Sequence, residues 1–315
     1  MRLTVPADCA GLRLDQALAR LFPDYSRNRL ARWVRDGRIT IDGRVLAPRH
    51  KLGGGEAVEL VLLPREETLA DRGEDMPLDT VHEDGVLLVL NKPAGLVVHP
   101  GSGNWHGTLL NALLHHAPVL ADVPRAGIVH RLDKDTSGLL VVAKTLAAQA
   151  DLVRQLQARS VKREYLAVVH GRPARDGKVD APIGRHPVHR TRMAVTARGR
   201  PAATHFQVLE RYASAALLRC RLETGRTHQI RVHLGSLGHP LVGDPTYGKR
   251  SSTIPFPRQA LHAERLALVH PVTRKTMTWQ VDPPADMQQL IAALRREAQA
   301  MPSSVVSRQS PRRRA

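Results

Sequence analysis

The sequence predicts an α+β fold in two parts: a small N-terminal module and a larger domain in which helices flank a mixed β-sheet. Segments with a helical period of apolar residues are mixed with short, β-prone apolar runs, which indicates that both kinds of element are present. The 315 residues exceed the ~100–200 residues of a typical single domain. An acidic segment with proline and glycine follows residues 1–64, so the boundary between the two parts is expected there.

Residues 1–64 are predicted to begin with two helices. The first has its apolar residues at the spacing i, i+3, i+4 and i+7: Leu14, Ala17, Leu18 and Leu21. Ser26 is expected to cap a second helix, which packs Leu30, Trp33 and Val34 inward and ends near Gly37. The second helix carries four arginines: Arg27, Arg29, Arg32 and Arg35. They are candidate contacts for a polyanion, and the alternative is an ordinary solvated helix face.

A hairpin is predicted after the second helix, with residues 39–41 and 44–45 on either side of an Asp42-Gly43 turn. Residues 65–84 carry eight acidic residues against two arginines, and we expect them to form a solvated acidic linker. The larger domain is predicted to span residues 85–298. Residues 299–315 are polar and basic, and are expected to form a disordered tail.

Within residues 85–298, apolar periodicity predicts strands and helices in mixed order. The predicted strands are the β-prone runs 86–90, 139–143, 165–169 and 216–222. The predicted helices are 108–115, 145–159 and 227–237. Cys220 falls on the apolar side of its strand, so its thiol is expected to be buried.

The composition of the chain indicates which class of partner it binds and in which compartment it works. A formal net charge of +18 indicates a polyanion partner, and nucleic acid is favoured because no apolar run is long enough to span a membrane. The N-terminus lacks the apolar core of a signal peptide, and two cysteines give no disulfide framework, so a reducing cytoplasm is expected. No cofactor motif is recognised, and His228 and His233, five residues apart, do not share a helical face as a metal pair would.

The run His130–Gly138 lies between the apolar segments 127–129 and 139–142, which we expect to be buried strands. Asp133 is thus a carboxylate in a polar turn with apolar walls. Arg226 is predicted to pair with it. The guanidinium would hold the carboxylate ionised, and an ionised carboxylate is a competent nucleophile or base. Tyr165 offers a flat face and a hydroxyl. Each has an ordinary alternative, namely a turn residue, a structural ion pair and a core edge.

Long motifs in this chain resemble the RluA type of pseudouridine synthases, and within it the D branch, whose substrate is the RNA of the large ribosomal subunit. The motifs are Phe22–Ser26, Asn91–Pro93, Asp122–Gly127, His130–Gly138, Tyr165, Thr224–Arg231, Leu241–Pro245 and Arg258–Ala263. The helix, basic helix and hairpin of residues 1–64 resemble an S4-type RNA-binding domain. The resemblance implies an S4-like module followed by a mixed, mainly antiparallel β-sheet catalytic domain flanked by helices.

The resemblance also implies an activity and roles. The activity is isomerisation of specific uridines to pseudouridine in 23S rRNA, in the helix 69 stem-loop for the D branch, with no cofactor or metal. Asp133 matches the essential aspartate, either attacking the sugar or removing its C2′ proton. Arg131 matches the residue that fills the gap left by the flipped base, Tyr165 the one that stacks on the uracil, and Arg226 the aspartate's partner. The expected partner is 23S rRNA or the large ribosomal subunit, bound by a monomer.

Two other classes of function fit these residues less well. A non-catalytic S4-type ribosome assembly factor would explain the charge and the N-terminal module, but it would not need Asp133 and Arg226 together. A hydrolytic RNA glycosidase needs two cooperating carboxylates. Asp135 is the nearest carboxylate in sequence, and within one turn it is expected to point away from Asp133.

Overall fold

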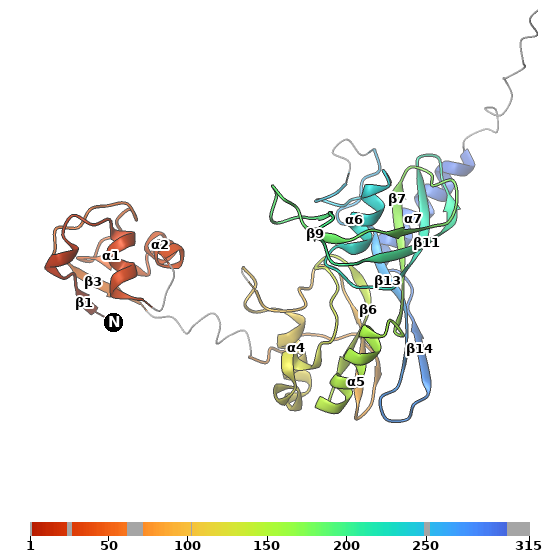
Figure 1. Ribbon diagram of the computed structural model, residues 1–315, viewed down its shortest axis with the longest axis horizontal. Helices are drawn as coiled ribbons and strands as arrows, with labels where there is room; N and C mark the ends of the chain where they lie inside the picture. The colour runs from red at the N-terminus through yellow and green to blue at the C-terminus, as the bar shows by residue number, and fades with distance from the viewer. Residues whose placement is uncertain (1, 24–26, 62–71, 102, 249–252, 301–315) are drawn as a thin grey trace, which may run out of the picture. The chain divides into compact units, whose positions relative to one another are not determined.

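The computed structural model describes residues 2–23, 27–61, 72–101, 103–248 and 253–300 of the chain. The chain divides into two compact units, Met1–Leu69 and Ala70–Ala315, which are described separately (Figure 1). The predicted α+β class is confirmed. The predicted tail from 301 onward, residues 65–71 of the predicted linker and the Ser26 cap lie outside the described residues.

The first unit packs two helices on a three-stranded antiparallel sheet. Its elements are β1 (Arg2–Thr4), η1 (Ala7–Cys9), α1 (Leu14–Leu21), α2 (Arg27–Arg35), β2 (Ile39–Ile41) and β3 (Ala57–Leu60). The sheet order is β1-β3-β2. Both predicted helices are present because their apolar stripes meet in one core, where Leu14, Leu18, Leu30 and Val34 are fully buried.

The predicted hairpin is only partly correct. Ile41 and Arg44 exchange a single antiparallel bridge across the turn, but the strand that pairs along β2 is β3, fifteen or more residues later. Asp42 adopts a left-handed φ of 48° and its Oδ1 accepts the backbone N–H of Ala57, which connects the turn to β3. The local turn signal therefore identified a bend, and the distant β3 supplied the pairing.

The second unit consists of a large sheet with helices on both faces. Its strands are β4 (Thr80–Glu83), β5 (Leu87–Lys92), β6 (Ser137–Ala143), β7 (Lys162–His170), β8 (Gly177–Asp180), β9 (Ile183–Arg185), β10 (Met193–Val195), β11 (Ala203–Arg211), β12 (Ala215–Leu222), β13 (Leu261–Val269) and β14 (Thr276–Gln280). Its helices are α4 (Leu109–His116), η2 (Pro118–Asp122), η3 (Pro124–Gly127), α5 (Leu146–Gln157), α6 (Gln229–Ser236) and α7 (Ala285–Ala300).

Nine of these strands form one sheet of order β4-β5-β6-β13-β7-β12-β11-β8, with β14 added on β13. Within the described residues, the β13–β6 pair is parallel and the other pairs of this sheet are antiparallel. The predicted mixed, mainly antiparallel sheet is therefore confirmed. The small β9–β10 pair forms a separate hairpin.

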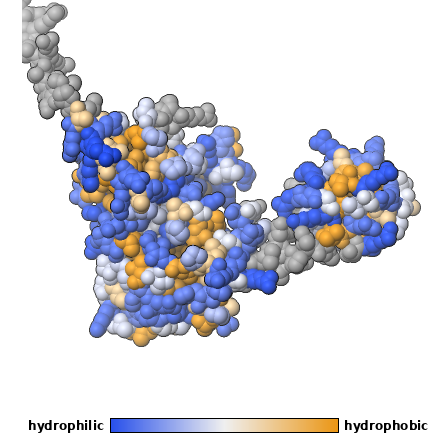
Figure 2. All heavy atoms as spheres, turned by 180° about the vertical axis from the view of Figure 1, so that it is seen from behind, coloured by the Kyte–Doolittle hydropathy of each residue, from blue (hydrophilic) through white to orange (hydrophobic). Residues whose placement is uncertain are grey.

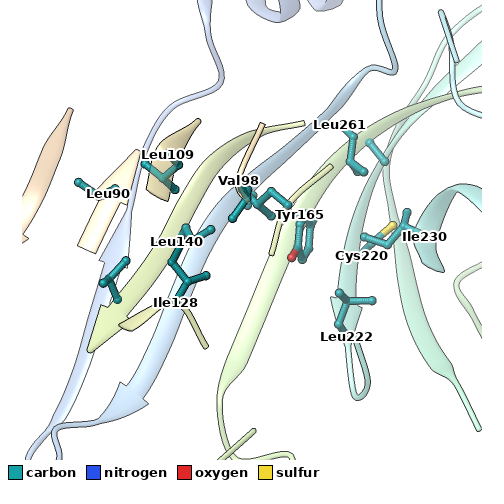
Figure 3. Close-up of a cluster of buried hydrophobic side chains, with 14 of the residues drawn as sticks. Leu90, Val98, Leu109, Ile128, Leu140, Tyr165, Cys220, Leu222, Ile230 and Leu261 are labelled. Carbon is teal, nitrogen blue, oxygen red and sulfur yellow. The ribbon is translucent and has the colours of Figure 1, made fainter. Parts of the chain in front are cut away.

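Alternation along the central strand β7 sends its side chains into two cores. Tyr165, Ala167 and Val169 join a cluster that includes α4 and α6 side chains, whereas Leu166 and Val168 join a cluster with α7. Figure 3 shows Tyr165 next to Cys220, its partner on β12, with Ile230 of α6 beyond them. Cys220 is fully buried, as predicted.

Two sequence predictions about boundaries are wrong. Residues 80–83, assigned to the linker, form β4 and pair with β5, and Glu74 accepts the backbone N–H of Gly107. This acidic segment is thus partly folded into the edge of the large sheet, and is not only a solvated linker. Residues 127–129 form no strand, because η3 ends at Gly127 and Ile128 makes only an isolated bridge to Val142. Ile128 is nevertheless buried.

Gly138 fixes the polar run against the sheet. It has a φ of 111° and pairs with Ala263 where β6 meets β13 in parallel, and a Cβ on it would lie 2.6 Å from the Ala263 backbone nitrogen. We expect Gly138→Ala to lower the free energy of unfolding by about 2–4 kcal/mol, because it adds overpacking to backbone strain. Urea unfolding measures this. Gly85→Ala, where a Cβ meets nothing within 4 Å, is the control, and equal effects of the two substitutions would contradict the argument.

Candidate active site

A cleft of about 660 Å³ lies in the second unit and collects all four residues predicted for the larger domain's site. Asp133, Arg131, Tyr165 and Arg226 all line it. Its wall also contains apolar side chains from three elements: Leu222, Ile230 and Leu261. The loop after His130 thus places the Asp133 carboxylate in a cleft whose wall is partly apolar and partly cationic.

Several backbone hydrogen bonds hold the loop that carries Asp133. The Thr136 N–H donates to the Asp133 carbonyl at 3.1 Å, and Arg258 donates from Nη1 to the Asp135 carbonyl at 3.0 Å. His130 accepts the backbone N–H of Val141 on its Nε2. Burial and the nearby Arg163 lower the pKa of His130 to about 3, so the ring is neutral, as this acceptor role requires.

Lys92 holds the same loop in place through hydrogen bonds to backbone carbonyls. It is 1% exposed, and its ammonium donates to the carbonyls of Pro93, Leu96 and Lys134 at 2.7–2.9 Å. Burial lowers its pKa to about 7, while the three carbonyl acceptors satisfy all of the donors of the charged form. Lys92 therefore ties the residue after Asp133 to the end of β5.

The cation paired with Asp133 is Arg231. Its Nη1 lies 2.9 Å from Asp133 Oδ2, and the Arg231 side chain is 5% exposed. The same guanidinium also binds a second carboxylate, that of the fully buried Asp244. Its Nε donates to Asp244 Oδ2 at 2.7 Å and its Nη2 donates to Asp244 Oδ1 at 2.9 Å. Burial raises the pKa of Asp244, but Arg231 and two backbone N–H donors lower it by more. One buried cation thus positions the Asp133 carboxylate and is itself fixed by Asp244.

The prediction that Arg226 pairs with Asp133 is wrong. Arg226 donates from Nε to the carbonyl of Pro201 at 3.1 Å. The Gln229 side chain accepts the Arg226 backbone N–H, and α6 begins at Gln229. Arg226 therefore lies in the preceding turn, whereas Arg231 lies in the first turn of the helix and reaches Asp133.

His228 is a second neighbour of Asp133, and its role was not predicted from the sequence. It has a left-handed φ of 57°, and its Nδ1 lies 2.8 Å from the Tyr247 hydroxyl, which accepts the backbone N–H of Met193 at 2.9 Å. With Tyr247 donating to Nδ1, the ring proton resides on Nε2, which lies 3.9 Å from Asp133 Oδ1. Burial is the main cause that lowers the pKa of His228, so the neutral ring is favoured.

Tyr165 lies at the wall of the cleft on β7. It is 5% exposed, and burial is the main cause that raises its pKa, so the phenol is neutral near pH 7. Two residues earlier on the same strand face, Arg163 is 7% exposed and also lines the cleft. Its Nε has no hydrogen-bond partner among the described residues.

Arginines surround the opening of the cleft. Five of them line it: Arg125, Arg131, Arg159, Arg200 and Arg226. Burial, together with the charges of Arg200 and Arg159, lowers the pKa of Arg226, which shows that its neighbours are like charges. Figure 2 shows one face of the unit, on which hydrophilic side chains separate several hydrophobic patches.

In the first unit, the predicted basic helix is α2. Arg27 donates from Nη2 to Asp15 of α1 at 2.8 Å, so this arginine also links the two helices. Arg32 and Arg35 are exposed. The Arg29 side chain lies outside the described residues.

Two further structural findings concern ions and membranes. Among the described residues, no three His, Cys, Asp or Glu side chains gather as they would around a metal ion. In the same part of the chain, no helix combines the length and apolarity that a membrane crossing requires.

Comparison with known proteins agrees with this geometry. Residues 86–236 match the family model described as RNA pseudouridylate synthase, and residues 12–58 match the S4 domain. A Nitrosomonas europaea protein named ribosomal large subunit pseudouridine synthase D is 55% identical, over 98% of this chain and 90% of its own length. The Pseudomonas aeruginosa protein of the same name is 52% identical, over 94% and 96%.

A solved structure supports the fold assignment. Human RNA pseudouridylate synthase domain containing 1 superimposes with a TM-score of 0.54 at 30% identity, over 71% of this chain and 96% of the human chain. The resemblance drawn from the motifs is thus confirmed, including its S4 domain. This chain belongs to the RNA pseudouridylate synthase family of isomerases.

Proposed function

We propose that this chain converts specific uridines of 23S rRNA to pseudouridine, and that its targets lie in the helix 69 stem-loop. The observation that carries the proposal is the Asp133–Arg231 pair in a cleft that Tyr165 lines and arginines surround. The names of the relatives support the large ribosomal particle as the source of the substrate. The net charge of +18 supports an RNA partner.

The reaction is an isomerisation within one nucleotide. The C1′–N1 bond breaks and its electron pair leaves with the uracil. The detached uracil rotates, C5 bonds to C1′, the C5 proton passes to a base, and N1 gains a proton. The target nucleotide must first leave the stack, which costs a few kcal/mol and less in a loop than in a duplex. A stem-loop substrate lowers that cost.

Asp133 is the reacting carboxylate in this proposal. Arg231 holds its Oδ2 at 2.9 Å, so Oδ1, which faces His228, is the oxygen that attacks C1′ or removes the C2′ proton. Tyr165 stacks on the uracil, and Arg131, which is exposed at the loop, occupies the gap left in the RNA. Arg226 serves as a phosphate contact at the opening of the cleft, since its predicted carboxylate partner is held by Arg231.

The first unit is proposed to add affinity for RNA, through Arg27, Arg29, Arg32 and Arg35 of α2, with the protein acting as a cytoplasmic monomer. Deleting residues 1–64 is expected to raise the apparent Kd for 23S rRNA by about tenfold or more, because tethering a second binding module raises the effective concentration of the first. Turnover at saturating RNA is expected to persist. Loss of all turnover at saturation would contradict this division of labour.

RNA binding is expected to weaken steeply with salt. Besides the buried Arg163 and Arg231, five arginines line the cleft. If each neutralises one phosphate of a single-stranded loop, log K falls by about 3.5 per tenfold rise in salt, or about 100-fold between 50 and 200 mM. Filter binding over this range measures the slope, and a flat response would refute the electrostatic argument.

The proposal is tested by mapping pseudouridine in unmodified 23S rRNA, free or in assembled large subunits, after incubation with the purified protein. New pseudouridine confined to the helix 69 loop is the expected result. Modification at other positions would keep the reaction and replace the substrate. RNA binding without any modification would favour the non-catalytic assembly factor.

A further inference from the structure

Arg163 is a buried cation for which the fold supplies no carboxylate. It is 7% exposed, and no carboxylate forms an ion pair with it among the described residues. Glu164, the next residue along β7, points to the other face of the strand, where its carboxylate lies 3.9 Å from Arg265. Burial lowers the pKa of Arg163. An uncompensated buried charge is costly, so its presence calls for a reason.

The position of Arg163 is built into the cleft. It precedes Tyr165 by two residues on one strand, so both side chains are on the same face of the sheet and both line the cleft. The guanidinium lies against Gly225, where a Cβ would be only 2.7 Å from Arg163 Nη1. Gly225 does not adopt a left-handed φ, so its backbone conformation does not require glycine. The space that a Cβ would take from the guanidinium explains the glycine at this position.

The contrast with Arg231 defines what Arg163 can do. The charge of Arg231 is balanced by Asp133 and Asp244. Arg163 has no carboxylate partner among the described residues, is 7% exposed, and lies on the same face of β7 as Tyr165. A fixed, largely buried cation stabilises negative charge that develops during a reaction, and needs no reorganisation when that charge appears.

We propose that Arg163 stabilises the uracil anion that exists between cleavage of the C1′–N1 bond and formation of the C5–C1′ bond. When the bond breaks, its electron pair moves onto the uracil, over N1 and the two carbonyl oxygens, whether Asp133 has attacked C1′ or removed the C2′ proton. When C5 bonds to C1′, an electron pair of the uracil forms the new bond; the C5 proton then leaves and N1 gains a proton. The anion is thus present only while the base is detached and turning against Tyr165, next to Arg163.

This inference rests on the proposed roles of Asp133 and Tyr165, and Arg163→Met tests it. The variant keeps the bulk and removes the charge, so kcat is expected to fall about 100-fold, as for loss of one electrostatic contact to a transition state, while the Kd for RNA changes less than about twofold. The melting temperature is expected to rise, because the substitution removes an uncompensated buried charge. A merely structural arginine would give a lower melting temperature.

Two variants separate charge from position. Arg163→Lys is expected to retain much of kcat, because it keeps a cation on the same strand. Gly225→Ala keeps the arginine but displaces its guanidinium, and is expected to lower kcat with the fold intact. Arg219→Met on β12 is the matched control, since Arg219 is paired with Glu264 in the same sheet, and its kcat is expected to equal that of wild type.

The outcomes are distinguishable. Wild type that forms no pseudouridine in 23S rRNA would contradict the proposed substrate. Wild-type turnover with an equally fast Arg163→Met would overturn the role of Arg163. An unchanged kcat with a raised Kd and a shallower salt slope would also overturn it, and would identify Arg163 as a phosphate contact instead.

Discussion

Replacing Asp133 with Asn is expected to lower turnover by at least about 10³-fold, because an amide neither attacks C1′ nor removes a proton. The fold should be retained, since Arg231 Nη1 can donate to the amide oxygen and its charge remains balanced by Asp244. Pseudouridine content by mass spectrometry measures turnover, and filter binding measures RNA affinity, which is expected to change less than about threefold.

Asp135 provides the matched control for this prediction. It lies two residues further along the same loop, outside the cleft lining, and its contribution to the loop is a backbone carbonyl that accepts from Arg258. Asp135→Asn should therefore turn over at close to the wild-type rate. Comparable losses in both variants would indicate that the loop as a whole, rather than the Asp133 carboxylate, is responsible.

Replacing Arg231 with Met is expected to abolish activity and to destabilise the protein by about 3–5 kcal/mol, the cost of leaving a buried charge without its partner. Asp244 is fully buried, and its other donors are two backbone N–H groups. Because the folded-state pKa of Asp244 lies below 3.8, its contribution to stability is present above that pH and is lost as the pH falls further. The variant should lack that dependence. Urea unfolding at several pH values measures both effects.

Two further variants isolate the geometry of this pair. Arg231→Lys keeps the charge but cannot reproduce the separate bonds to Asp133 and Asp244, so we expect partial stability and low turnover. Arg295→Met removes an exposed pair with Glu210 and should cost less than about 1 kcal/mol. A loss of stability no larger in Arg231→Met than in Arg295→Met would contradict the role assigned to the buried network.

Local sequence patterns were sufficient to predict the elements that are defined by residues close together in the sequence. The helices α1, α4 and α5 were predicted because the signals for each lie within one segment of the chain; in α4 and α5, Thr108 and Thr145 at the N-termini accept backbone N–H groups of the first turn. The strands β13 and β14 and the helix α7 were not predicted individually. Ser137 pairs with His262, 125 residues away, and a register of that span is not encoded in a local pattern.

The candidate site was predictable in its residue types more than in its pairings. Asp133 and Tyr165 line one cleft, as the motifs indicated. The partner of Asp133 was misassigned because Arg226 and Arg231 are in the same motif, and the motif alone does not indicate which of the two guanidinium groups reaches the carboxylate. Arg231 could have been found from Asp244, which belongs to another recognised motif and needs a buried cation. His228 and Arg163 depend on a left-handed turn and on a missing counter-charge, which the sequence does not display.

The most direct test of the central claim is tritium release from 23S rRNA that carries C5-tritiated uridine, with wild type and Asp133→Asn side by side. The isomerisation requires the C5–H bond to break, and the carboxylate must act before C5 can bond to C1′. We predict release by wild type, one tritium for each pseudouridine mapped in the product, and none above background from Asp133→Asn. Release by both proteins would contradict the assignment of Asp133, and release by neither would contradict the proposed activity on this RNA.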